Sequence, residues 1–339
     1  MSAVLSGFDI IELLLDEIPI AGVIGLADRY STDVVSGYYN GRRWCRDRGI
    51  EYIEADKYNL SGKRDVENIG GLEIDVMLVV GWQRLIPGWL IDHVRTATLG
   101  LHGSGYGIND GRGRSPQTWA LILRNPVFSL SLFRVDAGID SGPVLGTAEY
   151  TLTERDDIRS SYAKACWTTA SLLKRCLNKE VLESNGMPQS REGFYLPQRK
   201  PNDGEIDWRR PTNDIDAFVR ALGRPYPGAC VSLGNDYLKI WRSRPFEIDC
   251  SIQDSPEPGM VGQILSSQEL IVHTGDGWLL IDEWDGPPGL KLRRGDVLPS
   301  SSWQDQMRTI VDRHRTKLPD CPLHSDILRE SGMCESEDR

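Results

Sequence analysis

A histidine and an aspartate in glycine-rich surroundings are the residues of this chain best suited to chemistry. His102 ends an apolar stretch and precedes Gly103-Ser104, while Asp140 lies in a turn between Gly138 and Gly142. Glycine lets a backbone approach a ligand closely, because it carries no side chain. An imidazole and a carboxylate can exchange protons with one reacting centre. These residues therefore predict a catalytic site rather than a packed core.

The segments that must position this site alternate between apolar strands and helix-like stretches. Buried strands are expected at residues 20–26, 74–80, 96–102 and 128–135, and a helix at 40–48. The alternation predicts an α/β fold with a Rossmann-like, doubly wound, mostly parallel sheet. Ligands bind beyond the carboxyl ends of such strands, where His102 and Gly81-Trp82-Gln83 would lie. The sequence has no GxGxxG motif, which argues against a dinucleotide site.

The second half of the chain changes pattern. An amphipathic helix is expected within 156–183, and the polar, turn-rich residues 184–201 are expected to form a linker. An OB-like C-terminal β-barrel is predicted by short strands at 229–233, 237–241, 261–265, 269–273 and 278–284. We therefore expect a catalytic domain at 1–183 and a barrel domain at 202–297. Residues 298–339 would form a C-terminal extension, with a short helix at 303–314 and a partly disordered tail.

Composition narrows the class of partner. The chain has 39 Lys and Arg residues and 49 Asp and Glu residues, a net charge of −10. This charge disfavours binding to nucleic acid, whose phosphates attract basic surfaces. No apolar run reaches the length of a membrane span. The first residues show no signal peptide, so a cytoplasmic protein is expected. The seven cysteines form no CxxC pair, which predicts reduced, mostly structural thiols without a zinc site or disulfide framework.

The segments around His102 resemble the formyltransferase family that uses 10-formyltetrahydrofolate. That family includes methionyl-tRNA formyltransferase, glycinamide ribonucleotide transformylase and the sugar N-formyltransferases. Its pattern is Asn-x-His-x-Ser, then a loop with Arg-Gly and Pro, then an Asp-Gly/Ser-Gly turn. The matching residues are His102, Ser104, Arg112-Gly113, Pro116 and Asp140-Ser141-Gly142. Further similar segments at 203–208, 226–229 and 238–241 extend the resemblance over roughly residues 1–297.

The resemblance implies an enzyme that transfers a formyl group from 10-formyltetrahydrofolate to an amine, with no metal. It assigns catalysis to His102 and Asp140. Asp136 is the competing carboxylate, but it matches a variable position of the family. The implied folate-binding residues are Gly81, Trp82, Gln83, Leu85, Ile86, Pro87, Gly138 and Gly142. The expected substrate-binding residues are Ser104, Arg112 and Arg114. The two arginines could contact anionic groups of the substrate, because guanidinium groups bind such groups bidentately.

One position departs from the family pattern. The family's asparagine, which holds the formyl oxygen as it becomes an oxyanion, falls on Gly100. Asn109 lies in a loop about two residues longer than the common form and is the candidate replacement donor. Three alternatives stay open: Asn109 or a backbone N–H holds the oxyanion, protonated His102 suffices, or the protein binds folate with weakened transfer.

The charge of the C-terminal part of the chain narrows the class of molecule that could accept the formyl group. Residues 197–300 contain twelve Lys/Arg and sixteen Asp/Glu, a net charge of −4, whereas a tRNA-binding barrel should be basic. The resemblance then favours the amine of a nucleotide-linked amino sugar. An amino acid or hydroxylated amino acid such as N-hydroxyornithine is the alternative, followed by methionyl-tRNA. We expect a small-molecule amine as partner, no nucleic acid and no membrane, and leave a homodimer open.

Overall fold

The computed structural model describes the whole chain except residues 33, 36, 191, 249–255, 267 and 334–339. It forms two compact units that interleave along the sequence. Unit 1 comprises Met1–Arg112, Val127–Thr151 and Tyr162–Gly193. Unit 2 comprises Gly113–Pro126, Leu152–Ser161 and Phe194–Arg339. The chain crosses between the compact units several times, and the domain boundaries expected from the sequence stay a prediction.

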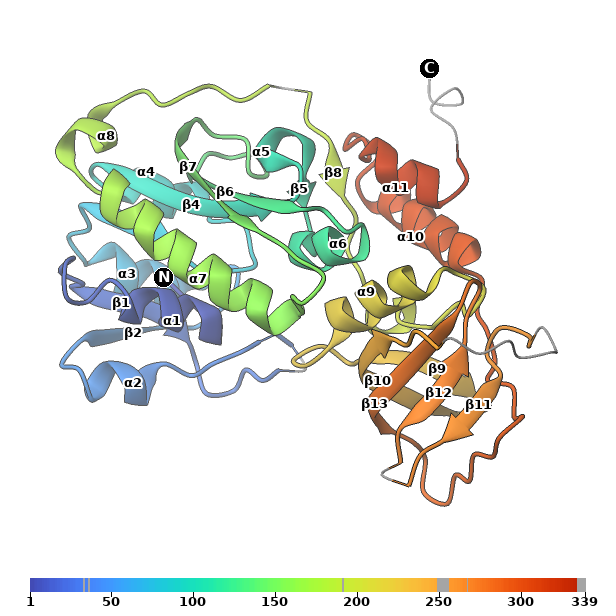
Figure 1. Cartoon of the computed structure of the whole chain (residues 1–339). Coiled ribbons are helices and arrows are strands. Elements are labelled where there is room, and N and C mark those ends of the chain that lie inside the picture. The colour runs from blue at the N-terminus through green and yellow to red at the C-terminus, as the bar shows by residue number, and fades with distance from the viewer. Residues whose placement is uncertain (33, 36, 191, 249–255, 267, 334–339) are drawn as a thin grey trace. The chain divides into compact units, whose positions relative to one another are not determined.

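Unit 1 is built on a Rossmann-like sheet (Figure 1). Its strand β1 (Gly22–Leu26) pairs in parallel with β2 (Glu51–Ala55), and β3 (Val76–Val79) pairs in parallel with β4 (Ala97–Ser104). The first residues join these two pairs. The Ser2 N–H donates to the Ile24 carbonyl at 3.0 Å, and the Val80 N–H donates to the Met1 carbonyl at 3.0 Å. The four strands therefore belong to one hydrogen-bonded layer.

The far side of this layer is antiparallel. Strand β6 (Val127–Arg134) pairs antiparallel with β4 and with β7 (Val144–Thr151). The register places His102 opposite Ser131 and Gly100 opposite Phe133. The layer thus contains the parallel pairs β1–β2 and β3–β4 and is antiparallel at the edge formed by β6 and β7, an arrangement common in doubly wound folds. The turn between β6 and β7 brings Asp140 back towards β4.

Alternate residues of β1 point to two different cores, as the two-residue period of a strand requires. Ile24 and Leu26 belong to a core with residues of α3 (Lys63–Gly70) and α4 (Gly88–His93). Val23 packs with residues of α1 (Leu5–Glu12) and α2 (Arg42–Arg46). Both faces of the sheet are therefore covered by helices. This explains why its strands read as continuous apolar runs.

The long helix expected at 156–183 is two helices. Helix α7 (Ile158–Cys176) ends before α8 (Lys179–Glu183) begins, and the Asn178 side chain accepts a hydrogen bond from the Val181 N–H at 3.1 Å. Asparagine is a favoured N-cap, because its side chain satisfies a free backbone donor of the first turn. The cap ends one helix and starts the next within two residues.

Unit 2 contains a five-stranded antiparallel sheet in the order β11-β12-β13-β10-β9. All five strands expected from the sequence are present, as β9 (Ala229–Leu233), β10 (Asp236–Pro245), β11 (Val261–Ile264), β12 (Leu270–His273) and β13 (Trp278–Asp285). Among the described residues no pairing of β11 with β9 closes the sheet into a barrel, so it is an open, OB-like arrangement. Helix α6 (Pro116–Ile122) packs against α9 (Thr212–Leu222) in the same unit.

The remaining elements are short, apart from one C-terminal helix. They are α5 (Gly107–Asp110), β5 (Arg112–Gly113), β8 (Tyr195–Leu196), the 3-10 turn Pro201–Asp203, α10 (Trp303–Lys317) and α11 (Ser325–Glu330). Helix α10 corresponds to the helix expected at 303–314. The structure differs from the expected tail at α11, whose Ile327 is completely buried. A packed apolar side chain orders this helix, which the polar composition around it did not indicate. Residues 334–339 of the expected tail lie outside the described part of the chain.

Candidate active site

His102 lies near the carboxyl end of β4 and has an acceptor at each ring nitrogen. Its Nε2 is 2.7 Å from the Gly111 carbonyl oxygen, and its Nδ1 is 3.2 Å from Asp140 Oδ2. A carbonyl oxygen only accepts, so Nε2 must carry a proton. The His102 side chain is 8% exposed and that of Asp140 27%. The carboxylate is therefore the member of the pair that a substrate can reach more easily.

The surroundings of His102 favour its charged form. Burial alone lowers the pKa of His102, but the charge and hydrogen bond of Asp140 and the Gly111 carbonyl raise it further than burial lowers it. The positive charge of Arg112 opposes this increase. The pKa of His102 is raised overall above its ordinary value of 6.5. The contact with Asp140 therefore favours the imidazolium form of His102 more than burial opposes it.

The two aspartates of the β6–β7 turn have different surroundings. Asp136 Oδ1 accepts from the Gly138 N–H at 2.9 Å and from the Ser141 hydroxyl at 2.8 Å. Asp136 thus stabilises the turn, as an aspartate that accepts from the backbone N–H two residues further on often does. Asp140 instead faces His102. The geometry brings together the two residues that the sequence analysis selected for catalysis.

The turn is tightly packed and strained. Asp140 has a φ of +51°, in the left-handed region that residues other than glycine rarely adopt. A Cβ at Gly142 would lie 1.8 Å from the Arg134 carbonyl oxygen. Only glycine can therefore occupy position 142 without moving the backbone. At Gly138 a Cβ would lie 2.0 Å from Ser141 Oγ. Backbone strain of this kind is frequent at functional sites.

Ser104 supports the loop that holds His102. Its side chain is completely buried, and its hydroxyl oxygen accepts from the Tyr106 N–H at 3.0 Å. A Cβ at Gly111 would lie 1.7 Å from this hydroxyl, so Gly111 and Ser104 are in close contact. The Gly111 carbonyl is the acceptor for His102. Ser104 therefore positions the Gly111 carbonyl. Its contact with a substrate stays a prediction.

Arg112 points into unit 1 and is only 2% exposed. Its Nη2 donates to the Ser190 carbonyl at 2.7 Å, to Gln189 Oε1 at 3.0 Å and to Asn109 Oδ1 at 3.4 Å. The Asn109 oxygen is thus engaged by a guanidinium. Arg114 belongs to unit 2 and is exposed. The substrate-binding roles of both arginines and the oxyanion role of Asn109 stay predictions.

The space beside Gly100 is filled by an aromatic ring. A Cβ at Gly100 would lie 2.7 Å from Cζ of Phe133, which is its partner across the β4–β6 ladder. The Phe133 side chain is itself 4% exposed. Position 100 therefore has no room for the amide that the family pattern carries there. Phe133 was not anticipated, because cross-strand neighbours depend on the register of two distant segments.

The segment expected to hold folate follows β3. Gly81 has a φ of +79°, and its carbonyl accepts from the Ala3 N–H at 3.1 Å. Trp82 is 8% exposed and packs edge-on against Tyr58, with ring centroids 5.0 Å apart. The Gln83 N–H donates to the Tyr58 hydroxyl at 2.9 Å. Trp82 Nε1 is buried and has no hydrogen-bond partner within the described structure.

The rest of this segment is partly exposed. Leu85 is 62% exposed, Ile86 is buried in a core, and Pro87 precedes the first residue of α4. An exposed leucine and a buried indole donor form an arrangement that suits a flat, partly apolar ring with polar edges. The residues Gly81 to Pro87 thus fit a pterin. Their role in binding stays a prediction.

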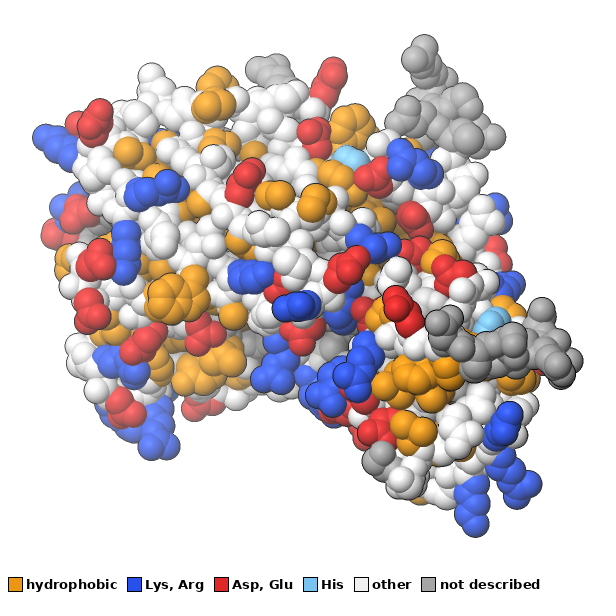
Figure 2. Space-filling view, viewed as in Figure 1, with side chains coloured by type: hydrophobic (Ala, Val, Ile, Leu, Met, Phe, Trp, Pro, Cys, Tyr) orange, Lys and Arg blue, Asp and Glu red, His pale blue; other side chains and the backbone are white. Residues whose placement is uncertain are grey.

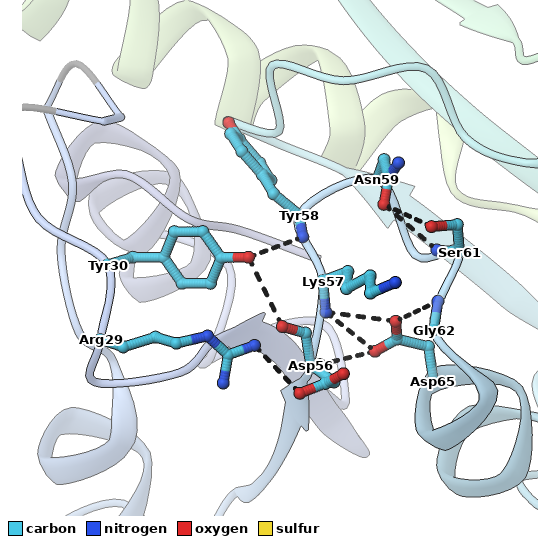
Figure 3. Close-up of polar contacts among 9 residues, drawn as sticks. All are labelled: Arg29, Tyr30, Asp56, Lys57, Tyr58, Asn59, Ser61, Gly62 and Asp65. Carbon is cyan, nitrogen blue, oxygen red and sulfur yellow. Dashed lines mark hydrogen bonds and ion pairs between the residues drawn. The ribbon is translucent and has the colours of Figure 1, made fainter.

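Tyr58 is held by a polar cluster at the carboxyl end of β2, shown in Figure 3. The Tyr58 N–H donates to the Tyr30 hydroxyl at 3.0 Å, which in turn donates to the Asp56 carbonyl at 3.4 Å. Asp65 accepts from the Lys57 N–H at 3.2 Å and from the Gly62 N–H at 3.0 Å. The cluster fixes the loop that supports Gln83.

Besides Phe133, two further residues at this site were not selected from the sequence. Gln189 lies in the segment expected to be a linker, and Tyr58 lies in a loop after β2. A glutamine in a polar turn and a tyrosine in a loop have no distinguishing pattern along the chain. Their contacts are visible only when distant segments are brought together.

Among the described residues no three or more His, Cys, Asp or Glu side chains lie together in a group that could hold a metal ion. No helix in the described part of the chain combines the length and apolar character needed to span a membrane.

Two family models match the sequence. The model described as "Formyl transferase" matches residues 40–175, and "Formyl transferase, C-terminal domain" matches residues 199–291. A methionyl-tRNA formyltransferase of Paraburkholderia phymatum is 25% identical over 272 residues, which cover 77% of this chain and 80% of that protein. The two family matches fall on the main α/β and β-rich parts of the chain and together cover more than half of it.

Solved structures with the same fold support this match. A variant of HypX from Aquifex aeolicus has a TM-score of 0.58 and 16% identity, covering 90% of this chain. The chain spans 61% of the length of HypX. An N-formyltransferase from Helicobacter canadensis, in complex with folinic acid and dTDP-3-aminofucose, has a TM-score of 0.57 and 13% identity. That match covers 84% of this chain and 97% of the other. At such identities the likeness concerns the fold.

Proposed function

Because this chain belongs to the formyl transferase family, we propose that it moves a formyl group from 10-formyltetrahydrofolate to the amine of a small substrate. The observation that carries the proposal is the His102–Asp140 pair, 3.2 Å apart beside the carboxyl end of β4. The pair combines a buried imidazole, whose pKa is raised, with a more exposed carboxylate. Such a pair meets the two needs of formyl transfer, a proton acceptor for the amine and positive charge near the formyl oxygen.

Each residue has a distinct role in this proposal. The folate co-substrate supplies the activated formyl group, and the acceptor amine attacks its carbon. Asp140 accepts the proton that the amine nitrogen loses and passes it to the folate nitrogen, which leaves as its bond to the formyl carbon breaks. His102 carries the positive charge that stabilises the negative charge developing on the formyl oxygen. Since Gly100 offers no side-chain donor there, this charge is more important here than in relatives with the asparagine.

We propose a nucleotide-linked amino sugar as the acceptor. The support is the acidic balance of residues 197–300 and the fold shared with the Helicobacter canadensis enzyme, whose complex contains dTDP-3-aminofucose. A free or hydroxylated amino acid is the next candidate. Methionyl-tRNA is favoured by the Paraburkholderia phymatum relative but disfavoured by the charge. A folate-binding protein with weakened catalysis is the alternative that the missing asparagine allows.

The acceptor can be identified by direct transfer assays. The protein would be incubated with 10-formyltetrahydrofolate and separate panels of dTDP-amino sugars, amino acids including N-hydroxyornithine, and methionyl-tRNA. The expected result is the mass gain of one formyl group on a sugar nucleotide. Formylation confined to another panel would replace the proposed acceptor. Folate binding without any product would select the weakened-catalysis alternative.

Variants then test the two proposed catalytic residues. His102→Ala and Asp140→Asn should each lower turnover by about two orders of magnitude, the usual scale for general acid–base groups. Asp92→Asn is a matched control, because Asp92 is an exposed carboxylate of the same unit. Near-normal turnover in either site variant would remove that residue from the mechanism.

A further inference from the structure

The side chain of Gln189 connects two parts of the candidate active site, the turn that carries Asp140 and the buried Arg112. Its Nε2 donates to the Asp140 carbonyl at 2.9 Å and to the Gly142 carbonyl at 2.6 Å. Its Oε1 accepts from Arg112 Nη2 at 3.0 Å. Carbonyls only accept and guanidinium groups only donate, so this pattern requires the amide orientation observed. Both N–H groups and the oxygen of one amide are therefore used.

These contacts close a ring. The Asp140 side chain contacts His102 Nδ1, and His102 Nε2 bonds to the Gly111 carbonyl. The next residue along the chain, Arg112, bonds to Gln189, which returns to the Asp140 backbone. The ring is contained in unit 1. Asp140 is thus held by His102 and by Gln189, while His102 is held by Asp140 and by the Gly111 carbonyl.

The segment that carries Gln189 is itself anchored. The Met187 and Val144 backbones exchange two hydrogen bonds, of 2.7 and 2.8 Å, at the start of β7. Gly193 leaves space for Arg112, because a Cβ at position 193 would lie 2.5 Å from Arg112 Nη1. The amide of Gln189 therefore extends from a fixed backbone towards a buried guanidinium. This is what a rigid support requires.

We propose that Gln189 is a positioning residue that holds the Asp140 turn at its observed distance from His102 by bridging it to buried Arg112. The need for such a support follows from the left-handed backbone of Asp140, a conformation that persists only where surrounding contacts hold it. Gln189 acts on the Asp140 and Gly142 carbonyls and not on a substrate. Its effect on turnover rests on the proposed function, whereas its effect on the His102–Asp140 pair does not.

The first test measures the His102–Asp140 contact without any substrate. The groups facing the His102 imidazole are the Asp140 carboxylate, the Arg112 guanidinium and the Gly111 carbonyl. An NMR titration of the His102 ring, assigned by its loss in His102→Gln, should give a lower pKa in Gln189→Ala than in the wild type. The reason is that a released Asp140 no longer stabilises the imidazolium. An unchanged His102 pKa in the folded Gln189→Ala protein would overturn the proposal.

Two further variants separate hydrogen bonding from packing and general stability. Gln189→Met keeps most of the side-chain volume but no amide, so it should lower the His102 pKa as Gln189→Ala does. If Gln189→Met behaved like the wild type, the role of position 189 would be packing and the proposed bridge would be wrong. Glu192→Ala is the matched control, since Glu192 is exposed on the same segment. It should leave the titration unchanged.

The second test uses turnover with the acceptor identified above. Gln189→Ala and Gln189→Met should lower kcat about ten- to a hundredfold, the scale of a small misplacement of reacting groups, with a smaller change in KM. A lower His102 pKa with unchanged kcat would show that the position of this pair does not limit turnover, and would overturn the catalytic part of the inference. If the wild type transferred no formyl group but the titration moved as expected, only the proposed function would fail.

Discussion

At the scale of single residues, His102 illustrates how contacts decide the protonation of a catalytic candidate. Its two ring nitrogens face a carbonyl and a carboxylate, so both of its N–H groups have acceptors when the ring is charged. Burial alone would favour the neutral ring. The direction of the pKa shift therefore depends on Asp140 staying in place.

A raised pKa has a consequence for stability that can be measured. Because folding raises the pKa of His102, its protonation contributes stability that is complete below the unfolded-state value of 6.5. That contribution is lost as the pH rises through the folded-state pKa. The free energy of unfolding of the wild type minus that of His102→Gln should therefore fall as the pH increases through this window. Chemical unfolding of both proteins over a pH series checks it. A difference that is flat or grows with pH would contradict the raised pKa.

The Gly100–Phe133 contact predicts a coupled pair of substitutions. Gly100→Asn alone should destabilise the protein by about 1–3 kcal/mol, because its side chain competes with the Phe133 ring for the same space. Adding Phe133→Ala creates room, so the double variant should be more stable than the sum of the two single effects implies. A double-mutant cycle of unfolding free energies measures this coupling. Additive effects would mean that the ring does not exclude a side chain at position 100.

At the scale of elements, the antiparallel pairing of β4 with β6 explains most of the site. It places Phe133 beside Gly100, and the turn after β6 returns Asp140 to His102. A parallel strand in that position would need a long crossover before the chain could return to the same edge. The direction of β6 therefore allows His102 and Asp140 to meet through one short turn.

The tight turn predicts a sharp contrast between two glycines. Gly142→Ala should lower turnover by about ten- to a hundredfold, because its Cβ would lie 1.8 Å from the Arg134 carbonyl oxygen and the turn carrying Asp140 must shift. Gly88→Ala is the control, since a Cβ there meets no atom within 4 Å. Steady-state kinetics and thermal unfolding of both variants test the contrast. Equal behaviour of the two would show that the turn can move without harm to the site.

At the scale of the whole molecule, charge is the feature most relevant to the partner. The chain carries a net charge of −10, and on the face shown in Figure 2 Lys/Arg and Asp/Glu side chains are interspersed over unit 1. Such a surface does not attract a polyanion over a distance, because neighbouring charges of opposite sign cancel.

This charge balance predicts weak binding to tRNA. Fluorescence anisotropy with labelled initiator tRNA at low salt should show no tight complex, since few phosphates would be neutralised. Repeating the titration over a salt series provides the control for non-specific attraction. A tight complex with a steep salt dependence would restore methionyl-tRNA as the acceptor and exclude the sugar nucleotide proposal.

Local patterns in the sequence were sufficient for many of the elements, although not for β2 and β7, and for the types of residue at the site. Apolar periodicity located β1, β3, β4, β6 and the five strands of unit 2, because burial on a sheet acts on each segment separately. Glycine and proton-carrying side chains marked the segments of His102 and Asp140, since these residue types are recognisable one at a time. Local information alone did not choose between Asp140 and Asp136. The resemblance to a family made that choice.

Only the tertiary structure decided which side chains meet. Gln189 bonds to residues 47 and 77 positions away, and no periodicity or composition relates such distant positions. The antiparallel direction of β6, the ring beside Gly100 and the inward position of Arg112 also arise from contacts between distant segments. The interleaving of the two units has the same origin. Local preference acts along the chain, whereas hydrogen-bond partners and packing neighbours exist only once the sheet has assembled, so these features depend on the folded molecule.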